Sequence, residues 1–260
     1  MPSGGVDVPA QISGNLTYVT VLINGGGPYT FILDTGASSV VVSPQIADLF
    51  PQSALGTMLV NSAVAGVESR VIRINTLELG TSRFTTFDAA VVDVNQIIQN
   101  DLGVTISGIV GFPLFETLLL TVDYPGERVL VQTGTLPAED DCHVFAMQKN
   151  EVGLLTMAIT VAGQTHQAVI DTGFDGFLSL PSDTTDLPFL ESPTLESVSL
   201  ITGPATVLSG RLADGSLTFG CFRSTTTPVN VGGDMALFGA SAFQNLVLTM
   251  DQQSGRVRLR

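Results

Sequence analysis

Positive charge and long apolar runs are both scarce in this sequence of 260 residues. Ten Lys and Arg stand against 24 Asp and Glu, so the net charge is −14 at pH 7 and the pI is near 4.2. An excess of carboxylates repels phosphate groups, which argues against nucleic acid and anionic membranes as partners. No apolar run is long enough to span a bilayer, so we expect no stable membrane insertion. A single lysine, Lys149, among many carboxylates suits a protein that works in acid.

Cysteine is limited to Cys142 and Cys221. They leave two alternatives open: one disulfide formed in an oxidising compartment, or two free and buried thiols. Together with His143 and His166 they lack the paired spacing of a zinc site, so we expect no metal and no cofactor. Residues 1–5 have neither the basic nor the apolar region of a secretory signal. The localisation therefore stays open, with periplasm or secretion favoured if a leader was removed.

The first half of the chain and the second half repeat the same motifs. An alternating strand from Gly14 to Asn24 leads into a second apolar strand that ends in Asp-Thr-Gly at Gly36. A matching strand from Gly153 to Gly163 leads into the same three residues, which end at Gly173. This first set of matches indicates that the chain contains a repeat.

A second set of matches follows at a constant spacing. The apolar-apolar-Gly motif at 109–111 returns at 237–239, and Asp123 returns as Asp251, each 128 positions later (239 − 111; 251 − 123). Motif matches at a constant offset indicate a tandem duplication. We therefore predict a mainly β protein of two similar lobes, residues 1–137 and 138–260, related by a pseudo-two-fold axis, with short helices at 44–50 and 113–118 and a linker at 134–142.

The two Asp-Thr-Gly turns supply the groups needed to hydrolyse an amide without a metal. Asp34 and Asp171 each end an apolar strand that carries the carboxyl to a rigid position. Two carboxyls that share one proton provide a base to activate water and an acid to protonate the carbonyl oxygen. Their titration belongs to the pair rather than to either residue. We therefore predict that both are catalytic.

The residues beside each aspartate fit this interpretation. Gly36 and Gly173 permit a tight turn and let backbone N–H groups approach the carboxylates. Thr35 and Thr172 carry hydroxyls that can bond across a two-fold interface. A single Asp-Thr-Gly is most often an ordinary turn or helix cap. Here it occurs twice, followed 77 and 68 positions later by apolar-apolar-Gly (111 − 34; 239 − 171), which favours the catalytic interpretation.

These motifs resemble the aspartic protease clan that contains pepsins and retropepsins, over almost the whole chain from Gly14 to Arg258. Residues 27–37 and 171–181 are especially similar to bacterial retropepsin-like domains. The resemblance implies two retropepsin- or pepsin-like β-barrel lobes fused in one chain, which would recreate internally what retropepsins make by homodimerisation. It therefore implies a monomer that acts on peptide or protein substrates.

The resemblance also implies roles for single residues. The two aspartates and two threonines take the catalytic and interlocking positions, and Gly111 and Gly239 match glycines of the loop that braces each turn. Asp175 occupies the place of a retropepsin aspartate that contacts the substrate backbone, whereas the first half has Ser38 there.

Two flaps are expected from hairpins at 63–68 and 202–206, which would bring Ala65, Gly66 and Gly203 near the substrate. Neither segment contains the tyrosine of the pepsin flap, so the sequence is closer to a fused retropepsin than to a small pepsin.

The predicted function is that of an aspartic endopeptidase with its active site between two lobes. One alternative is a catalytically silent module that binds peptides in the same cleft. A second alternative is a scaffold that pairs each Asp-Thr-Gly turn with its counterpart in another chain.

Overall fold

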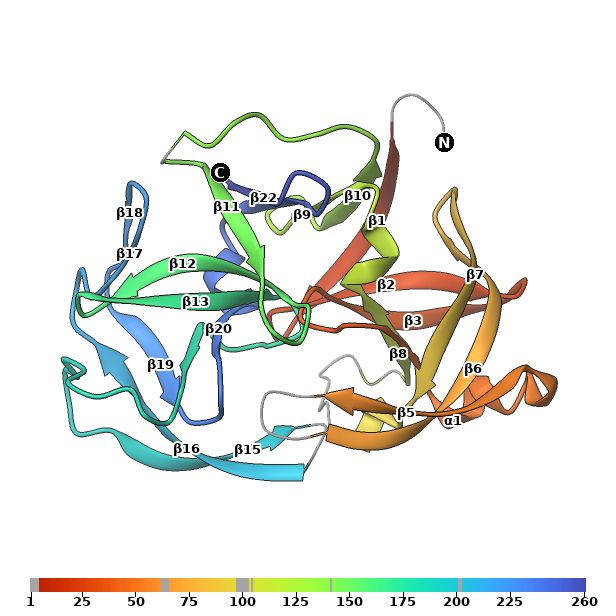
Figure 1. The fold of residues 1–260 in the computed structure, drawn as a ribbon, viewed down its shortest axis with the longest axis horizontal. Coiled ribbons are helices and arrows are strands. Elements are labelled where there is room, and N and C mark those ends of the chain that lie inside the picture. The colour runs from red at the N-terminus through yellow and green to blue at the C-terminus, as the bar shows by residue number, and fades with distance from the viewer. Residues whose placement is uncertain (1–4, 62–65, 97–102, 104, 141, 201–202) are drawn as a thin grey trace.

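Most of the chain lies in β-strands (Figure 1). The computed structural model describes residues 5–61, 66–96, 103, 105–140, 142–200 and 203–260. In these residues the helical elements are α1 (Pro44–Ala47) and four 3-10 turns at Pro51–Ser53, Val94–Gln96, Phe112–Phe115 and Ala240–Phe243. The predicted mainly β class is confirmed, although both predicted helices are shorter than expected. No helix in the described ranges is long and apolar enough to cross a membrane.

The strands divide between the two halves of the chain. Those of the N-terminal half are β1 (Val6–Ser13), β2 (Leu16–Ile23), β3 (Gly26–Asp34), β4 (Val40–Val42), β5 (Ala54–Asn61), β6 (Gly66–Leu79), β7 (Ser82–Val91), β8 (Ile106–Gly111), β9 (Leu119–Asp123) and β10 (Arg128–Gln132). Those of the C-terminal half are β11 (Val144–Lys149), β12 (Leu155–Val161), β13 (Gln164–Asp171), β14 (Leu178–Leu180), β15 (Thr194–Leu200), β16 (Gly203–Leu212), β17 (Leu217–Phe219), β18 (Phe222–Arg223), β19 (Thr227–Val231), β20 (Ala236–Gly239), β21 (Val247–Asp251) and β22 (Arg256–Leu259).

Each aspartate ends a strand that has the same neighbours in both halves. β3 runs parallel to β8 and places Asp34 opposite Gly111, while β13 runs parallel to β20 and places Asp171 opposite Gly239. A three-residue strand lies antiparallel to the same partner, β4 to β8 and β14 to β20. That short strand is also parallel to a longer one, β4 to β7 and β14 to β19. The repeat seen in the sequence therefore corresponds to repeated strand pairings.

A six-stranded antiparallel sheet joins the halves, in the order β1, β10, β9, β21, β22 and β11. It lies at the top of the view in Figure 1, with the N-terminal half to the right and the C-terminal half to the left. At its centre the hydroxyls of Thr121 and Thr249 are 3.0 Å apart. The connecting segment is fastened to it, because Leu136 N–H donates to Asp251 at 2.9 Å and Arg256 donates to the Leu136 carbonyl at 3.2 Å.

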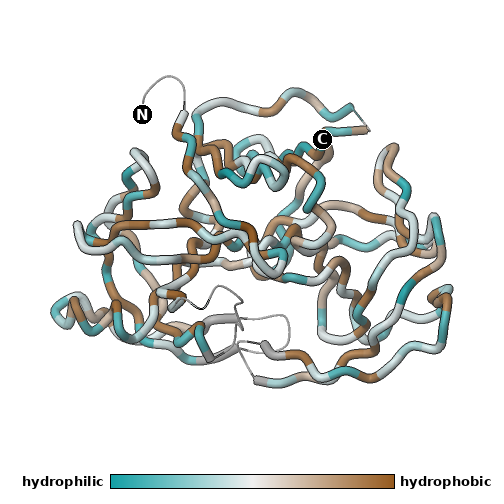
Figure 2. Tube along the Cα trace, turned by 180° about the vertical axis from the view of Figure 1, so that it is seen from behind, coloured by the Kyte–Doolittle hydropathy of each residue, from teal (hydrophilic) through white to brown (hydrophobic). Residues whose placement is uncertain are grey.

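Alternation of apolar and polar residues along the strands builds the core, and Figure 2 shows hydrophobic and hydrophilic stretches interleaved on the trace. Phe238 and Phe243 are buried and meet edge to face, with ring centroids 4.9 Å apart. Cys142 and Cys221 form a disulfide that ties the start of β11 to the turn between β17 and β18. The structure thus selects the first of the two alternatives that the cysteine count left open.

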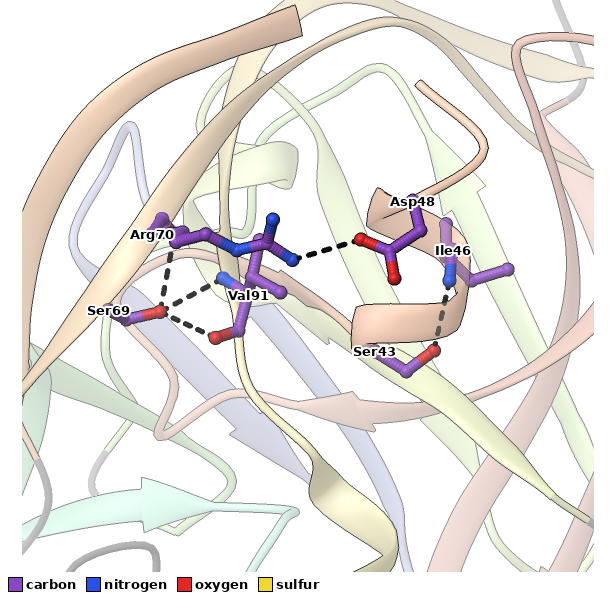
Figure 3. Close-up of polar contacts among 6 residues, drawn as sticks. All are labelled: Ser43, Ile46, Asp48, Ser69, Arg70 and Val91. Carbon is purple, nitrogen blue, oxygen red and sulfur yellow. Dashed lines mark hydrogen bonds and ion pairs between the residues drawn. The ribbon is translucent and has the colours of Figure 1, made fainter. Parts of the chain in front are cut away.

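Two hairpins, β5–β6 and β15–β16, extend from the body of the molecule, one in each half (Figure 1). Figure 3 shows how the middle of β6 is held. The Ser69 hydroxyl accepts from Val91 N–H at 3.1 Å and donates to the Val91 carbonyl at 2.6 Å. Arg70 forms an ion pair of 3.2 Å with Asp48, just beyond α1. These contacts fix the hairpin to β7 and α1.

Candidate active site

The two Asp-Thr-Gly turns meet face to face at the junction of the halves. Gly36 packs on the carboxyl of Asp171, so that a Cβ added to this glycine would lie 2.5 Å from Asp171 Cγ. Gly173 packs on Asp34 in the same way, and its Cβ would lie 2.3 Å from Asp34 Cγ. Only glycine allows the backbone of each turn to come this close to the opposite carboxyl. The structure therefore brings together the two aspartates that the sequence placed 137 positions apart (171 − 34).

The two threonines lock the turns to each other. Thr35 N–H donates to Thr172 Oγ1 at 3.0 Å, and Thr172 N–H donates to Thr35 Oγ1 at 3.1 Å. Each hydroxyl donates in turn to a carbonyl of the opposite strand, Thr35 to Ile170 at 2.6 Å and Thr172 to Leu33 at 2.8 Å. Both threonines are buried, so these bonds are protected from water. The threonine hydroxyls therefore hold the two turns, and with them Asp34 and Asp171, in fixed relative positions.

Backbone donors and burial set the electrostatics of the pair. Gly36 N–H donates to Asp34 Oδ1 at 2.8 Å, and the N–H groups of Gly173 and Phe174 donate to Asp171 Oδ1 at 2.9 and 3.1 Å. Burial raises the pKa of Asp34 well above its ordinary value, and the neighbouring charge of Asp171 raises it further. Burial also raises the pKa of Asp171, against the opposing effect of the Gly173 N–H. The pair therefore retains a proton at a pH where an exposed carboxyl has lost it.

Gly111 and Gly239 lie directly behind the turns. A Cβ at Gly111 would be 2.1 Å from the carbonyl oxygen of Ser39, and one at Gly239 would be 2.3 Å from that of Gly176. The residue after each glycine donates its N–H to the carbonyl three positions beyond the aspartate, at 3.2 and 2.8 Å. Both glycines thus pack against the back of an Asp-Thr-Gly turn.

The predicted substrate-binding residues are distributed over the turns and the hairpins. Ser38 and Asp175 lie four positions beyond their aspartates, and both are exposed. Gly66 begins β6 and Gly203 begins β16, at the connecting ends of the two hairpins. Ala65 lies outside the described residues. Residues 66–68 and 203–206 of the expected flap segments thus lie in two hairpins, and the rest of both segments lies outside the described residues.

One flank of the site is closed by residues that sequence reasoning missed. The side chain of Asn15 donates to the backbone carbonyl of Asp175 at 2.9 Å. Gln244 donates to the Asn15 carbonyl at 3.1 Å and to the Ala240 carbonyl at 3.0 Å. The pair Gly14-Asn15 is a turn signal in the sequence, but nothing in it identifies a partner 160 positions away.

The other flank contains a pocket of about 180 Å³. Its walls are residues 35 and 37–38 of the Asp34 turn, Phe112 and Pro113, residues 152–155, and Gln252. A larger hollow of about 310 Å³ lies between β1, β2 and the end of β6, and neither aspartate lines it. Neither aspartate lines the smaller pocket, but Thr35, next to Asp34, does, so this pocket adjoins the Asp34 turn.

In the described ranges no group of three or more His, Cys, Asp or Glu side chains is arranged to hold a metal ion. Residues 19–114 match a family model described as aspartyl protease. The matched segment contains Asp34 and Gly111 and ends before the second turn. No curated protein matches the sequence significantly.

Proposed function

The chain belongs to an aspartic protease family, and from this premise we propose that it is an endopeptidase whose catalytic groups are Asp34 and Asp171. A peptidase-type function follows from the family. The observation that carries the assignment of the catalytic pair is the close packing of each glycine on the opposite carboxyl. That packing creates a buried pair with raised pKa values at the junction of the halves.

In the proposed reaction one carboxyl of the pair is ionised and the other is protonated. The ionised carboxylate takes a proton from a water molecule as the water oxygen bonds to the peptide carbonyl carbon. The protonated carboxyl gives its proton to the carbonyl oxygen, so a neutral tetrahedral diol forms without a covalent bond to the protein. When the C–N bond breaks, the departing nitrogen takes one proton from the pair and the diol returns one to it.

One complete site would need both halves of the chain. We propose that residues 1–137 and 138–260 are two lobes produced by internal duplication, and that a monomer holds the whole site. The matched strand pairings around Asp34 and Asp171 support this proposal. An extended peptide would lie under the hairpins β5–β6 and β15–β16, with Ser38 and Asp175 near its backbone.

The direct test compares Asp34→Asn and Asp171→Asn with the wild type. Each purified protein digests a denatured protein mixture across a pH series, and mass spectrometry identifies the cut sites. We expect both variants to lose at least about 10³-fold in turnover, because an amide cannot exchange the shared proton. Glu191→Gln, which removes an exposed carboxylate from a loop, is the matched control. Activity close to that of the wild type in either Asn variant would overturn the shared pair.

Mixing the variants tests whether the pair forms within one chain. If each aspartate paired with its own copy in a second chain, one single variant would remain active by itself. If the lobes exchanged between chains, a mixture of the two inactive variants would recover a fraction of the activity. The proposal requires inactive variants, alone and mixed, and a wild type whose specific activity does not fall on dilution. Peptide binding without any cleavage by the wild type would favour a silent binding module instead.

A further inference from the structure

Positive charge is distributed unequally between the two halves of the chain. The four basic residues of the first half all form ion pairs with carboxylates: Arg70, Arg73, Arg83 and Arg128. The six of the second half form no ion pair within the described residues: Lys149, Arg211, Arg223, Arg256, Arg258 and Arg260. The last three of these follow one another at alternate positions, in and just after β22. In the part of the chain that the structure describes, this arginine row (Arg256, Arg258 and Arg260) therefore concentrates positive charge without a carboxylate partner.

The arginine row lies on the outer face of the six-stranded sheet. Side chains at alternate positions of a strand point to the same side, about 7 Å apart. Val257 and Leu259, which alternate with the arginines, are buried in the core, so the arginines point away from it. Figure 1 shows β22 at the top of the molecule and the hairpins β5–β6 and β15–β16 at the bottom. The arginine row is thus on the side of the molecule opposite the hairpins.

Two guanidinium groups of the arginine row have a buried donor without an acceptor. In the described ranges, the Nε atoms of Arg256 and Arg258 are shielded from water and have no hydrogen-bond partner. Arg256 is held in place, because its Nη1 donates to the Leu136 carbonyl at 3.2 Å. Burial lowers the pKa of Arg258, and the charge of Arg260 lowers it further. A buried donor on a charged group is costly without an acceptor, so these two N–H groups require a protein group, a water molecule or an anion.

The carboxylates around the arginine row bond to other donors. Asp251 lies opposite Arg256 in the register of β21 and β22. Its Oδ2 accepts from Leu136 N–H at 2.9 Å and from the Ser254 hydroxyl at 2.6 Å. Asp140 of the connecting segment accepts three backbone N–H groups with its Oδ1, at 2.6–3.1 Å. Neither carboxylate forms an ion pair with an arginine of the described residues, so these two side chains do not supply the missing acceptor.

We propose that Arg256 and Arg258 bind an oxyanion, the phosphate or carboxylate group of a small ligand, on the outer face of the six-stranded sheet. Guanidinium groups present N–H donors in a planar fork that matches both kinds of group, and two forks about 7 Å apart can hold one anion between them. Arg260 adds positive charge at the end of the row. The inference is independent of the proposed function, because it involves neither Asp34 nor Asp171. A bound oxyanion should stabilise the folded protein, since it would bind where Arg256 also holds the connecting segment.

The first experiment follows the arginine Nε–H signals of the isotope-labelled wild-type protein by NMR while inorganic phosphate is added. Phosphate replaces sodium chloride step by step, so that the ionic strength stays constant. We expect saturable shifts for Arg256 and Arg258 and no comparable shift for Arg211, an exposed residue of β16. A second titration with succinate shows whether the site takes carboxylates as well as phosphate, and binding of either anion supports the site. Equal shifts for all arginines would indicate screening of charge rather than binding and would overturn the proposal, as would the absence of a shift with both anions.

The second experiment uses Arg258→Met, which removes the charge and keeps a long side chain. The dissociation constant of the anion should rise about tenfold or more, because charge-assisted hydrogen bonds are lost. The wild type should also melt at a higher temperature in that anion than in chloride of the same ionic strength, and the variant should lose most of this difference. Arg211→Met is the matched control, because it removes one exposed positive charge from β16, and it should bind the anion as the wild type does. An unchanged dissociation constant in Arg258→Met would overturn the site. If this variant does not fold, the titration of the wild type decides by itself.

Discussion

The two halves of the molecule agree where the carboxyls meet and differ at the rim of the site. The aspartates, threonines and glycines of the two turns make the same contacts in both directions. The flanks differ, because Tyr124 and the bond from Asn15 to the Asp175 carbonyl lie on one of them, whereas Gln252 lines a pocket on the other. A shared proton needs two like carboxyls, but a peptide chain has a direction and presents different side chains on either side of the cut. In the proposed endopeptidase, the symmetric turns would therefore carry out the chemistry, and the asymmetric rim would recognise the peptide.

The largest loss of activity is expected from substitutions in the two Asp-Thr-Gly turns, where the halves are alike. Gly36→Ala and Gly173→Ala each place a methyl group within 2.5 Å of the opposite carboxyl carbon, so the pair must move apart. A displacement of about 1 Å at a reacting group can cost on the order of 100-fold in rate, and we expect at least this loss in kcat for both variants. Gly26→Ala is the control, because the atom nearest to its added Cβ is the hydroxyl oxygen of the Tyr29 side chain, at 3.2 Å. If kcat fell in only one of the two variants, Gly36→Ala or Gly173→Ala, the two turns would not be functionally equivalent.

The interlocked threonines should contribute to stability equally. Thr35→Val and Thr172→Val each remove a hydroxyl that accepts one N–H and donates to one carbonyl in a buried place. Leaving these groups unpaired should lower the free energy of unfolding by roughly 2–4 kcal/mol in each variant. Chemical denaturation measures the change, and Thr→Ser at the same positions should restore most of it. If the two variants lost different amounts of unfolding free energy, the two threonines would not contribute equally to stability.

Asp34 and Asp171 are expected to make the stability of the folded protein depend on pH. Since burial raises the folded-state pKa of both carboxyls, their contribution to stability is complete below the ordinary carboxyl pKa and is lost as the pH rises through the raised values. Asp34→Asn removes this loss, so the variant should melt at a higher temperature than the wild type at pH 7. The difference should shrink as the pH falls toward 4. Glu191→Gln is the control, because it measures how much the melting temperature rises when any one negative charge is removed from a protein with a net charge of −14. A lower melting temperature for Asp34→Asn at pH 7 would contradict the raised pKa values.

The sequence predicted the repeated parts of the fold better than the parts that occur once. Asp-Thr-Gly and the apolar-apolar-Gly motif appear twice, and the family resemblance that they carry implied that Gly111 and Gly239 brace the turns, where the structure places both. Asn15 could not be placed in the same way, because its partner lies 160 positions away and the matching residue is Leu154. The pairing of the two cysteines could not be predicted either, since two cysteines define no pattern. Contacts that occur once depend on tertiary packing, which local sequence does not encode.

The 128-residue offset also marks a difference between the halves. One position beyond Asp123 and Asp251, the same offset aligns Tyr124 with Gln252. An aromatic side chain in the first half thus corresponds to a shorter amide side chain in the second. β9 and β21 pair with each other around Thr121 and Thr249. Tyr124 and Gln252, which follow these strands, therefore leave the central sheet at corresponding points. Comparing the halves of a repeat for differences, rather than only for matches, would have indicated the flank that contains the pocket.

The smallest effect is expected from opening the closed flank at Asn15. This residue has φ +67°, which favours Asn or Gly, so Asn15→Gly removes the side-chain amide without adding backbone strain. Loss of the bond to the Asp175 carbonyl should lower the free energy of unfolding by about 0.5–1.5 kcal/mol. It should also loosen the turn that carries Asp171, so peptides with larger side chains on that side of the cut should be accepted a few-fold better. Asn24→Gly is the control, because Asn24 has φ +49° and its side chain accepts two backbone N–H groups in another turn. That control should lose stability without any change in cleavage preference. If Asn15→Gly behaves as the control does, the bridge is structural only, and the difference in recognition between the flanks rests on the Gln252 side alone.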